Sequence, residues 1–293
     1  MHIEQKTEHH PDRTPAQPND NLAPDGTPDQ STPQPNHLPS TVTDLLTAIQ
    51  FLTRLPVPEL PFAPDSLARS TKFFPLVGLL IGGIAAAIAH LLTPHLTRPV
   101  AALTVVLSTV LLTGGLHEDG LADAADGFGG GHTPARILAI LRDSRIGTYG
   151  ALALLFSVAA RTLLLASISP QYLTAYLIAA HVLCRWTTLP LSRWLPPARG
   201  PEDGQGARIA NLTSTSSLWI GSLLALAVTL LALRQQAAIP LLLAAALTYL
   251  TGRFYRAKIG GVTGDCFGAT NQLVEVAVYL CGAWLSIPGA WPA

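Results

Sequence analysis

Long apolar segments recur along this chain of 293 residues and restrict what it can fold into. A helix needs about 20 apolar residues to cross the hydrocarbon core of a bilayer. Segments that approach this length cover residues 74–93, 99–116, 149–168, 172–191, 218–233, 237–254 and 271–287. Only 12% of the residues are charged, against about 25% in a typical soluble domain. We therefore predict an all-α, polytopic integral membrane protein, a helical bundle of about seven transmembrane helices (range 6–8).

The first 40 residues differ in composition from the rest of the chain. They are rich in proline and polar residues and contain almost no large apolar side chains. Such a segment cannot bury enough apolar surface to offset the entropy of ordering. The sequence therefore predicts a disordered tail over residues 1–40 and a single transmembrane catalytic domain over residues 41–293.

Basic residues are distributed unevenly between the connections of the predicted spans. With the N-terminus placed inside, the inner loops hold Arg54, Arg69, Lys72, Arg136, Arg142, Arg145, Arg193, Arg199, Arg208, Arg253, Arg256 and Lys258, and the outer turns hold Arg98 and Arg234. Cytoplasmic loops carry an excess of lysine and arginine in membrane proteins. This bias predicts a cytoplasmic N-terminus. The acid-rich stretches 117–148, 192–217 and 255–269 then also lie at the cytoplasmic face, where we expect the active site.

The stretch HEDGLADAADGFGGG, residues 117–131, carries four acids directly after an apolar segment. If the helix through 99–116 continues past His117, then Asp119, Asp123 and Asp126 fall within about 60° of one another on one helix face. Carboxylates in this arrangement repel one another, whereas Mg²⁺ prefers oxygen ligands of this kind. We predict a metal site formed by these three aspartates. A solvated acidic helix end is the alternative.

Two further segments carry candidate substrate-binding residues. In LRDSRIGTYG, residues 141–150, Arg142 and Arg145 are expected to lie one helical turn apart, as suits a diphosphate. They are otherwise ordinary arginines at the inner end of a span. In GGVTGDCFGATNQLVEV, residues 260–276, Asp265 is a candidate substrate ligand or, alternatively, a helix N-cap.

Arg161, His181 and Arg185 are ionisable residues inside predicted spans. Arg185 lies near the cytoplasmic end of its span, from which it either reaches the site or extends to the interface. His181 shares a helix face with Arg185 and is interpreted as an interior histidine. The sequence identifies no partner for Arg161, which is near the middle of its span.

Several blocks together resemble the cobalamin synthase family, the adenosylcobinamide-GDP ribazoletransferases of vitamin B12 assembly. They are FLTRLPVP (51–58), FFPLVGLLIG (73–82), GGLHEDGLADAADGF (114–128), ILRDSRIGTYG (140–150), VLCRWTT (182–188) and GGVTGDCFGA (260–269). The chain departs from the family pattern at Ala207, where asparagine is expected. It departs again at Asn271 and Gln272, which lie near positions where acids are expected.

The resemblance implies a late step of cobalamin biosynthesis. α-Ribazole, or α-ribazole 5′-phosphate, would attack the diphosphate of adenosylcobinamide-GDP, giving adenosylcobalamin or its phosphate and releasing GMP. The family is Mg²⁺-dependent and lies in the bacterial inner membrane. Arg142, Arg145, Arg185 and Asp265 would then bind substrate, and Asp126 or Asp143 would accept the ribazole proton as the catalytic base. The lipid bilayer is an expected partner, nucleic acid is not, and the sequence leaves a homo-oligomer open.

Two other classes of protein share some of these features. A CDP-alcohol phosphotransferase also uses a helix-borne aspartate cluster, but with a different spacing. A cation transporter would need a polar path through the bilayer, yet the predicted spans hold few ionisable residues. The sequence therefore favours the transferase.

Overall fold

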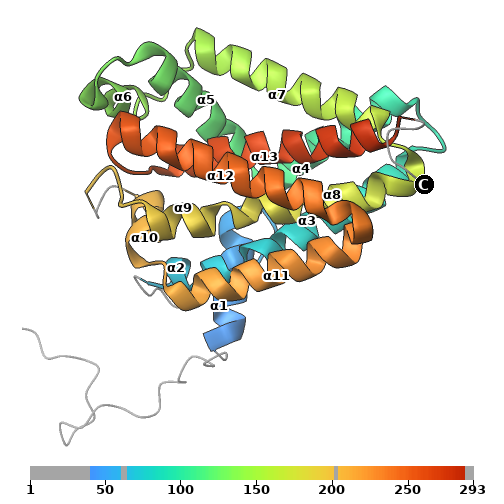
Figure 1. Cartoon of the computed structure of the whole chain (residues 1–293), viewed down its shortest axis with the longest axis horizontal. Helices are drawn as coiled ribbons and strands as arrows, with labels where there is room; N and C mark the ends of the chain where they lie inside the picture. Colours follow the sequence, from blue (N-terminus) through green and yellow to red (C-terminus); the bar gives the residue numbers. More distant parts are fainter. Residues whose placement is uncertain (1–39, 61–64, 201–203, 288–293) are drawn as a thin grey trace, which may run out of the picture. The chain divides into compact units, whose positions relative to one another are not determined.

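The computed structural model describes residues 40–60, 65–200 and 204–287, so the prediction for residues 1–39 of the tail lies outside the described residues. The described part is helical, apart from one isolated bridge between Pro197 and Val262. The helices and 3-10 turns, labelled in Figure 1 where there is room, are α1 (Ser40–Leu52), α2 (Ser66–Ser70), η1 (Thr71–Phe73), α3 (Phe74–Leu92), α4 (Arg98–Thr113), α5 (Leu116–Gly130), α6 (Pro134–Ile140), α7 (Thr148–Ser167), α8 (Pro170–Trp186), α9 (Thr188–Trp194), α10 (Gln205–Leu212), α11 (Thr215–Leu233), η2 (Arg234–Ala237), α12 (Ala238–Ile259) and α13 (Gly264–Leu285).

All seven apolar segments form helices, which confirms the all-α fold class in the described residues. By length and composition, three helical stretches can cross a membrane: Ser66–Leu92, Thr148–Ser167 and Thr215–Ile259. A fourth is counted if α4 and α5 form one broken span. These apolar helices indicate a helical membrane protein, and the number of seven spans stays a prediction.

Helix α4 ends at Thr113, so it does not run on through His117 as the sequence predicted. Gly114 and Gly115 both adopt left-handed backbone conformations, with φ of 67° and 72°, which glycine accepts without the steric cost of a Cβ atom. The amides of these two glycines close the end of α4 on the carbonyls of Leu111 and Val110. The next helix, α5, leaves at an angle of 91° to α4. The expected continuous helix is therefore wrong, but the acids still share one helix because α5 contains them all.

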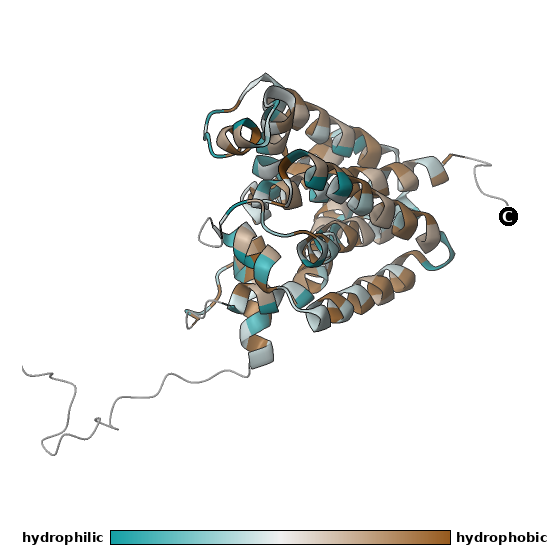
Figure 2. Cartoon of the chain, turned by 60° about the vertical axis from the view of Figure 1, so that its left-hand side comes forward, coloured by the Kyte–Doolittle hydropathy of each residue, from teal (hydrophilic) through white to brown (hydrophobic). Residues whose placement is uncertain are grey.

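The interior of the bundle is organised by α8 and α13. Helix α13 lies between α7 and α12 in Figure 1 and also packs against α5 and α8. Helix α8 packs against α3, where Gly78 and Gly82 let the two backbones approach closely. Small residues have this role in membrane helices, because close packing replaces the hydrophobic driving force. Figure 2 shows hydrophilic residues gathered mainly at one end of the helices, whereas most of the helix lengths are hydrophobic.

We expect Gly78→Ala to destabilise the bundle. A Cβ atom at this position would collide with the backbone of α8 at His181, and such overpacking costs about 1–3 kcal/mol. Gly83→Ala is the matched control, because a Cβ atom there has no heavy atom within 4 Å in the described structure. Thermal unfolding in detergent should give a lower Tm for Gly78→Ala only. Equal Tm values for the two variants would contradict the α3–α8 contact.

Candidate active site

A cavity of about 1150 Å³ opens at the end of the bundle where α5, α10 and α13 meet. The residues that line it include Asp119, Asp123 and Asp265, together with Arg54 and Arg208. Ser144 and Ile146 contribute from the loop that precedes α7. This size is at the upper end of the range of ligand sites. The cavity therefore has room for a large ligand with anionic groups.

The three cavity-facing aspartates come from two helices that touch through glycine. Asp119 and Asp123 are one turn apart on α5, and Asp265 lies in the first turn of α13. A Cβ atom added to Gly120 would lie 3.1 Å from both the Asp265 carbonyl oxygen and the Gly268 Cα atom. No side chain separates α5 from α13 at this point. The contact therefore brings Asp265 close enough for its charge to act on Asp123.

Asp265 is not the N-cap of α13. The N-cap is Thr263, whose hydroxyl oxygen accepts a hydrogen bond from the Cys266 amide at 3.5 Å and donates one to Asp265 Oδ2 at 3.1 Å. Burial raises the pKa of the Asp265 carboxyl above its ordinary value, although Arg199, with Nη2 3.9 Å from Oδ2, opposes this shift. A bound cation would offset the cost of burying this charge. The alternative reading of Asp265 as a helix cap is thus wrong, and the residue faces the cavity instead.

Asp126 shares the helix face of Asp119 and Asp123 but binds backbone amides. Its Oδ2 accepts a hydrogen bond from the Gly147 amide at 2.6 Å, and its Oδ1 accepts one from the Gly150 amide at 2.9 Å. These bonds attach the start of α7 and the preceding loop to α5. Asp126 is not among the described residues that line the cavity. Its predicted roles as metal ligand and base stay predictions, and both would have to share the carboxylate with these amides.

The arginines of LRDSRIGTYG are not arranged on a helix. Helix α6 ends at Ile140, and the following residues form a loop up to Gly147, so the expected helical spacing of Arg142 and Arg145 is wrong. Arg145, which is 87% exposed, donates from Nη2 to Asp143 Oδ2 at 2.6 Å and from Nε to Oδ1 at 3.0 Å. This hydrogen bonding lowers the pKa of Asp143 to about 2. Asp143 therefore stays ionised and paired with Arg145. It is not among the described residues that line the cavity, and its role as a base stays a prediction.

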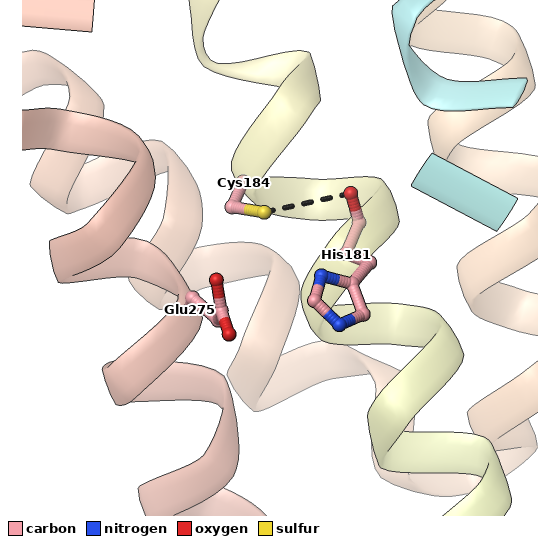
Figure 3. Close-up of side chains that lie close together, drawn as sticks. All are labelled: His181, Cys184 and Glu275. Carbon is pink, nitrogen blue, oxygen red and sulfur yellow. Dashed lines mark hydrogen bonds between the residues drawn. The ribbon is translucent and has the colours of Figure 1, made fainter. Parts of the chain in front are cut away.

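Arg185 lies in the interior of the bundle, and the described cavity lining does not include it. Its Nη1 is 2.6 Å from His181 Nδ1 and 2.9 Å from Cys184 Sγ. Figure 3 shows His181 and Cys184 of α8 beside Glu275 of α13, with the Cys184 thiol donating to the His181 carbonyl. The three offer ligand atoms within 4.8 Å of one another. The guanidinium already occupies this cluster with positive charge, which disfavours a metal ion there. Substrate binding by Arg185 stays a prediction.

Sequence reasoning missed the cations and amides that line the cavity. Arg54 follows α1, where its backbone amide donates to the Leu112 carbonyl at 2.7 Å. Gln205 and Arg208 belong to α10, which approaches the start of α13 because Gly206 packs directly against Gly264. The signals available were the block FLTRLPVP, which contains Arg54, and the glycines of segment 197–211. Sequence alone does not explain these glycines, because Gly206 packs against Gly264, which is distant in sequence.

Fold and cavity together define a helical membrane protein with carboxylates and arginines gathered around one large internal cavity. The chain belongs to the cobalamin-5-phosphate synthase family, which residues 44–283 match. No solved structure matches the chain.

Relatives from three bacteria are named adenosylcobinamide-GDP ribazoletransferase. The protein of Polaromonas sp. is 36% identical over 276 residues, covering 84% of this chain and 98% of that protein. The protein of Azorhizobium caulinodans is 44% identical over 252 residues, covering 80% and 93% respectively. The protein of Vibrio cholerae is 37% identical over 239 residues, covering 80% and 91%.

We expect Asp126→Asn to loosen the loop before α7, because the amide nitrogen of asparagine cannot accept a backbone hydrogen bond. Loss of a hydrogen bond to a charged group costs about 1.5–3 kcal/mol, which corresponds to roughly 10-fold or faster amide exchange. Hydrogen–deuterium exchange over residues 143–150 measures this. Asp65→Asn is the control, because Asp65 is exposed and pairs with Arg69 of α2, the short helix that it precedes. Unchanged exchange in Asp126→Asn would contradict the two bonds.

Proposed function

We propose that this chain is an adenosylcobinamide-GDP ribazoletransferase that joins α-ribazole, or its 5′-phosphate, to adenosylcobinamide-GDP and releases GMP. The observation that carries the proposal is the large cavity lined by Asp119, Asp123 and Asp265. The names of the relatives and the family membership support it. The reaction takes place in a multi-pass protein of the bacterial inner membrane, with the site and N-terminus on the cytoplasmic side and about seven spans.

Asp119, Asp123 and Asp265 are the residues that would hold Mg²⁺. The donor set fits this ion, because it consists of carboxylate oxygens and leaves positions for substrate phosphates and water. A bound Mg²⁺ would supply charge neutralisation at the diphosphate. Asp126, the third ligand predicted from the sequence, also holds the loop of residues 141–147 against α5. It thereby shapes the wall to which Ser144 and Ile146 contribute.

Arginine side chains bind the phosphate groups. Guanidinium groups match phosphate oxygens in bidentate geometry and stay charged at every relevant pH. Arg54 and Arg208 line the cavity, so they are placed to orient the diphosphate. Arg142 and Arg145 belong to the loop whose Ser144 and Ile146 reach the cavity wall. We assign these two arginines to the outer part of the nucleotide.

The attacking hydroxyl of ribazole must lose its proton to a nearby acceptor. The sequence predicted Asp126 or Asp143 for this step, but the first is bonded to two amides and the second to Arg145. We propose that a carboxylate facing the cavity accepts the proton. The attack then forms the new phosphodiester bond, and GMP leaves with the electron pair of the broken diphosphate bond.

We expect detergent-purified protein to release GMP from adenosylcobinamide-GDP only when both α-ribazole and Mg²⁺ are added. Asp123→Asn should lower this rate by more than about 100-fold, since changes to partners of metal ligands alone cost about 10- to 100-fold. Glu59→Gln is the matched control, because Glu59 is exposed and outside the described cavity lining.

The same assay distinguishes the alternatives. Folded protein without GMP release, but active on a CDP-linked substrate, would identify a CDP-alcohol phosphotransferase. Cation flux into liposomes without either reaction would identify a transporter. Full activity of Asp123→Asn with unchanged Mg²⁺ dependence would overturn the metal-site assignment while leaving the reaction in place.

A further inference from the structure

Arg161 is the one charged residue of α7, a helix that is long and apolar enough to cross a membrane. Its side chain is only 1% exposed. An arginine at such a position is costly unless it is paired. Its Nη1 lies 2.8 Å from Glu118 Oε1 and 3.5 Å from Glu275 Oε1. The structure thus supplies the partners that the sequence could not identify.

The two glutamates tie α7 to the helices that bear the cavity-facing aspartates. Glu118 belongs to α5 and Glu275 to α13. Gln272 of α13 reinforces the junction, donating to Glu118 Oε1 at 3.3 Å and accepting from Ser157 of α7 at 2.9 Å. The side chain of Glu118 is therefore held from two helices at once.

The two halves of α5 are held in different ways. The C-terminal half is fixed by Asp126, which accepts hydrogen bonds from amides at the start of α7, and by Phe128, which stacks on Tyr255. The N-terminal half contacts α13 through Gly120 and Gly268, which have no side chains to interlock. The ion pair of Glu118 adds an interaction that fixes which face this half presents.

The position of Glu118 decides where the metal-binding face points. Side chains advance by about 100° per residue around a helix, so Asp119 and Asp123 lie about 100° and 140° from Glu118, on the same side. With Glu118 held against α7 and α13, both aspartates are directed into the cavity, where they line the wall with Asp265. Rotation of α5 about its axis would move Asp119 and Asp123 together.

We propose that Glu118, Arg161 and Glu275 form a positioning network that fixes the rotation of α5 and so aligns Asp119 and Asp123 with Asp265. The inference rests on the proposed function only in that these three aspartates bind a divalent cation. The network is not built for maximal stability. Glu118 Oε2 and Arg161 Nη2 have no hydrogen-bond partner in the described structure, and replacing a buried ion pair by neutral side chains is often neutral or stabilising.

The test measures binding of Mn²⁺ to the full chain in detergent by electron paramagnetic resonance, without substrate. The double variant Glu118→Gln/Arg161→Met removes both charges with little change in volume. We expect it to have a lower Tm, because Glu275 is left buried without Arg161, and to bind Mn²⁺ about 10- to 100-fold more weakly. Arg161→Lys, which keeps the positive charge, should lose less affinity than the double variant.

Lys72→Met is the matched control. Lys72 pairs at 2.7 Å with the buried Asp44, which Arg69 also contacts, and it lies outside the described cavity lining. The Lys72→Met variant therefore also removes a cation from a buried carboxylate, but one that lies outside the described cavity lining, so Mn²⁺ binding should be unchanged. Equal loss of affinity in this variant would reduce the network to a general contribution to stability and overturn the inference.

Two further outcomes decide the question. A folded double variant that binds Mn²⁺ as tightly as the unmodified chain overturns the positioning role alone. If the double variant does not fold, Glu118→Gln alone retains the size and the hydrogen-bond acceptor, and unchanged affinity there overturns it equally. Absence of Mn²⁺ binding to the unmodified chain overturns the metal site and the inference with it, whereas GMP release tests the reaction independently.

Discussion

The close contact between Gly120 of α5 and Gly268 of α13 is the constraint on which the candidate site depends. It brings together two stretches that are almost 150 residues apart in sequence. With any larger side chain at either position, the backbones would have to separate, and Asp265 would move away from Asp119 and Asp123. The cavity, its acidic wall and its proposed chemistry all follow from this one approach of two helices.

A close approach of carboxylates carries an electrostatic cost, and arginines beside the acids offset it. Arg199 lies beside Asp265, and Arg161 lies between Glu118 and Glu275. The first reaches Asp265 because the segment around Pro196 and Ala198 hydrogen-bonds to Val262. Positive charge thus lies beside the acids of α5 and α13.

Features that depend on local sequence were predictable, and those that depend on distant contacts were not. The helical stripe of Asp119, Asp123 and Asp126 follows from the 3.6-residue period, and the apolar segments follow from composition. The turn at Gly114 and Gly115 was missed because glycine permits a helix as well as a left-handed conformation. The bonds of Asp126 to Gly147 and Gly150, and the partners of Arg161, join separate helices, so no spacing in the sequence reveals them.

The pairing of Arg161 also has a consequence for how the chain enters the membrane. Synthesis proceeds from the N-terminus, so α5 exists before α7, and α13 follows both. An arginine at the centre of an inserting helix costs about 2.5–3.5 kcal/mol, and Glu118 is already present to offset that cost when α7 emerges. Glu275 and Asp265 arrive together on α13. A nascent chain therefore carries an incomplete acidic cluster, and the third cavity carboxylate is delivered only when α13 docks.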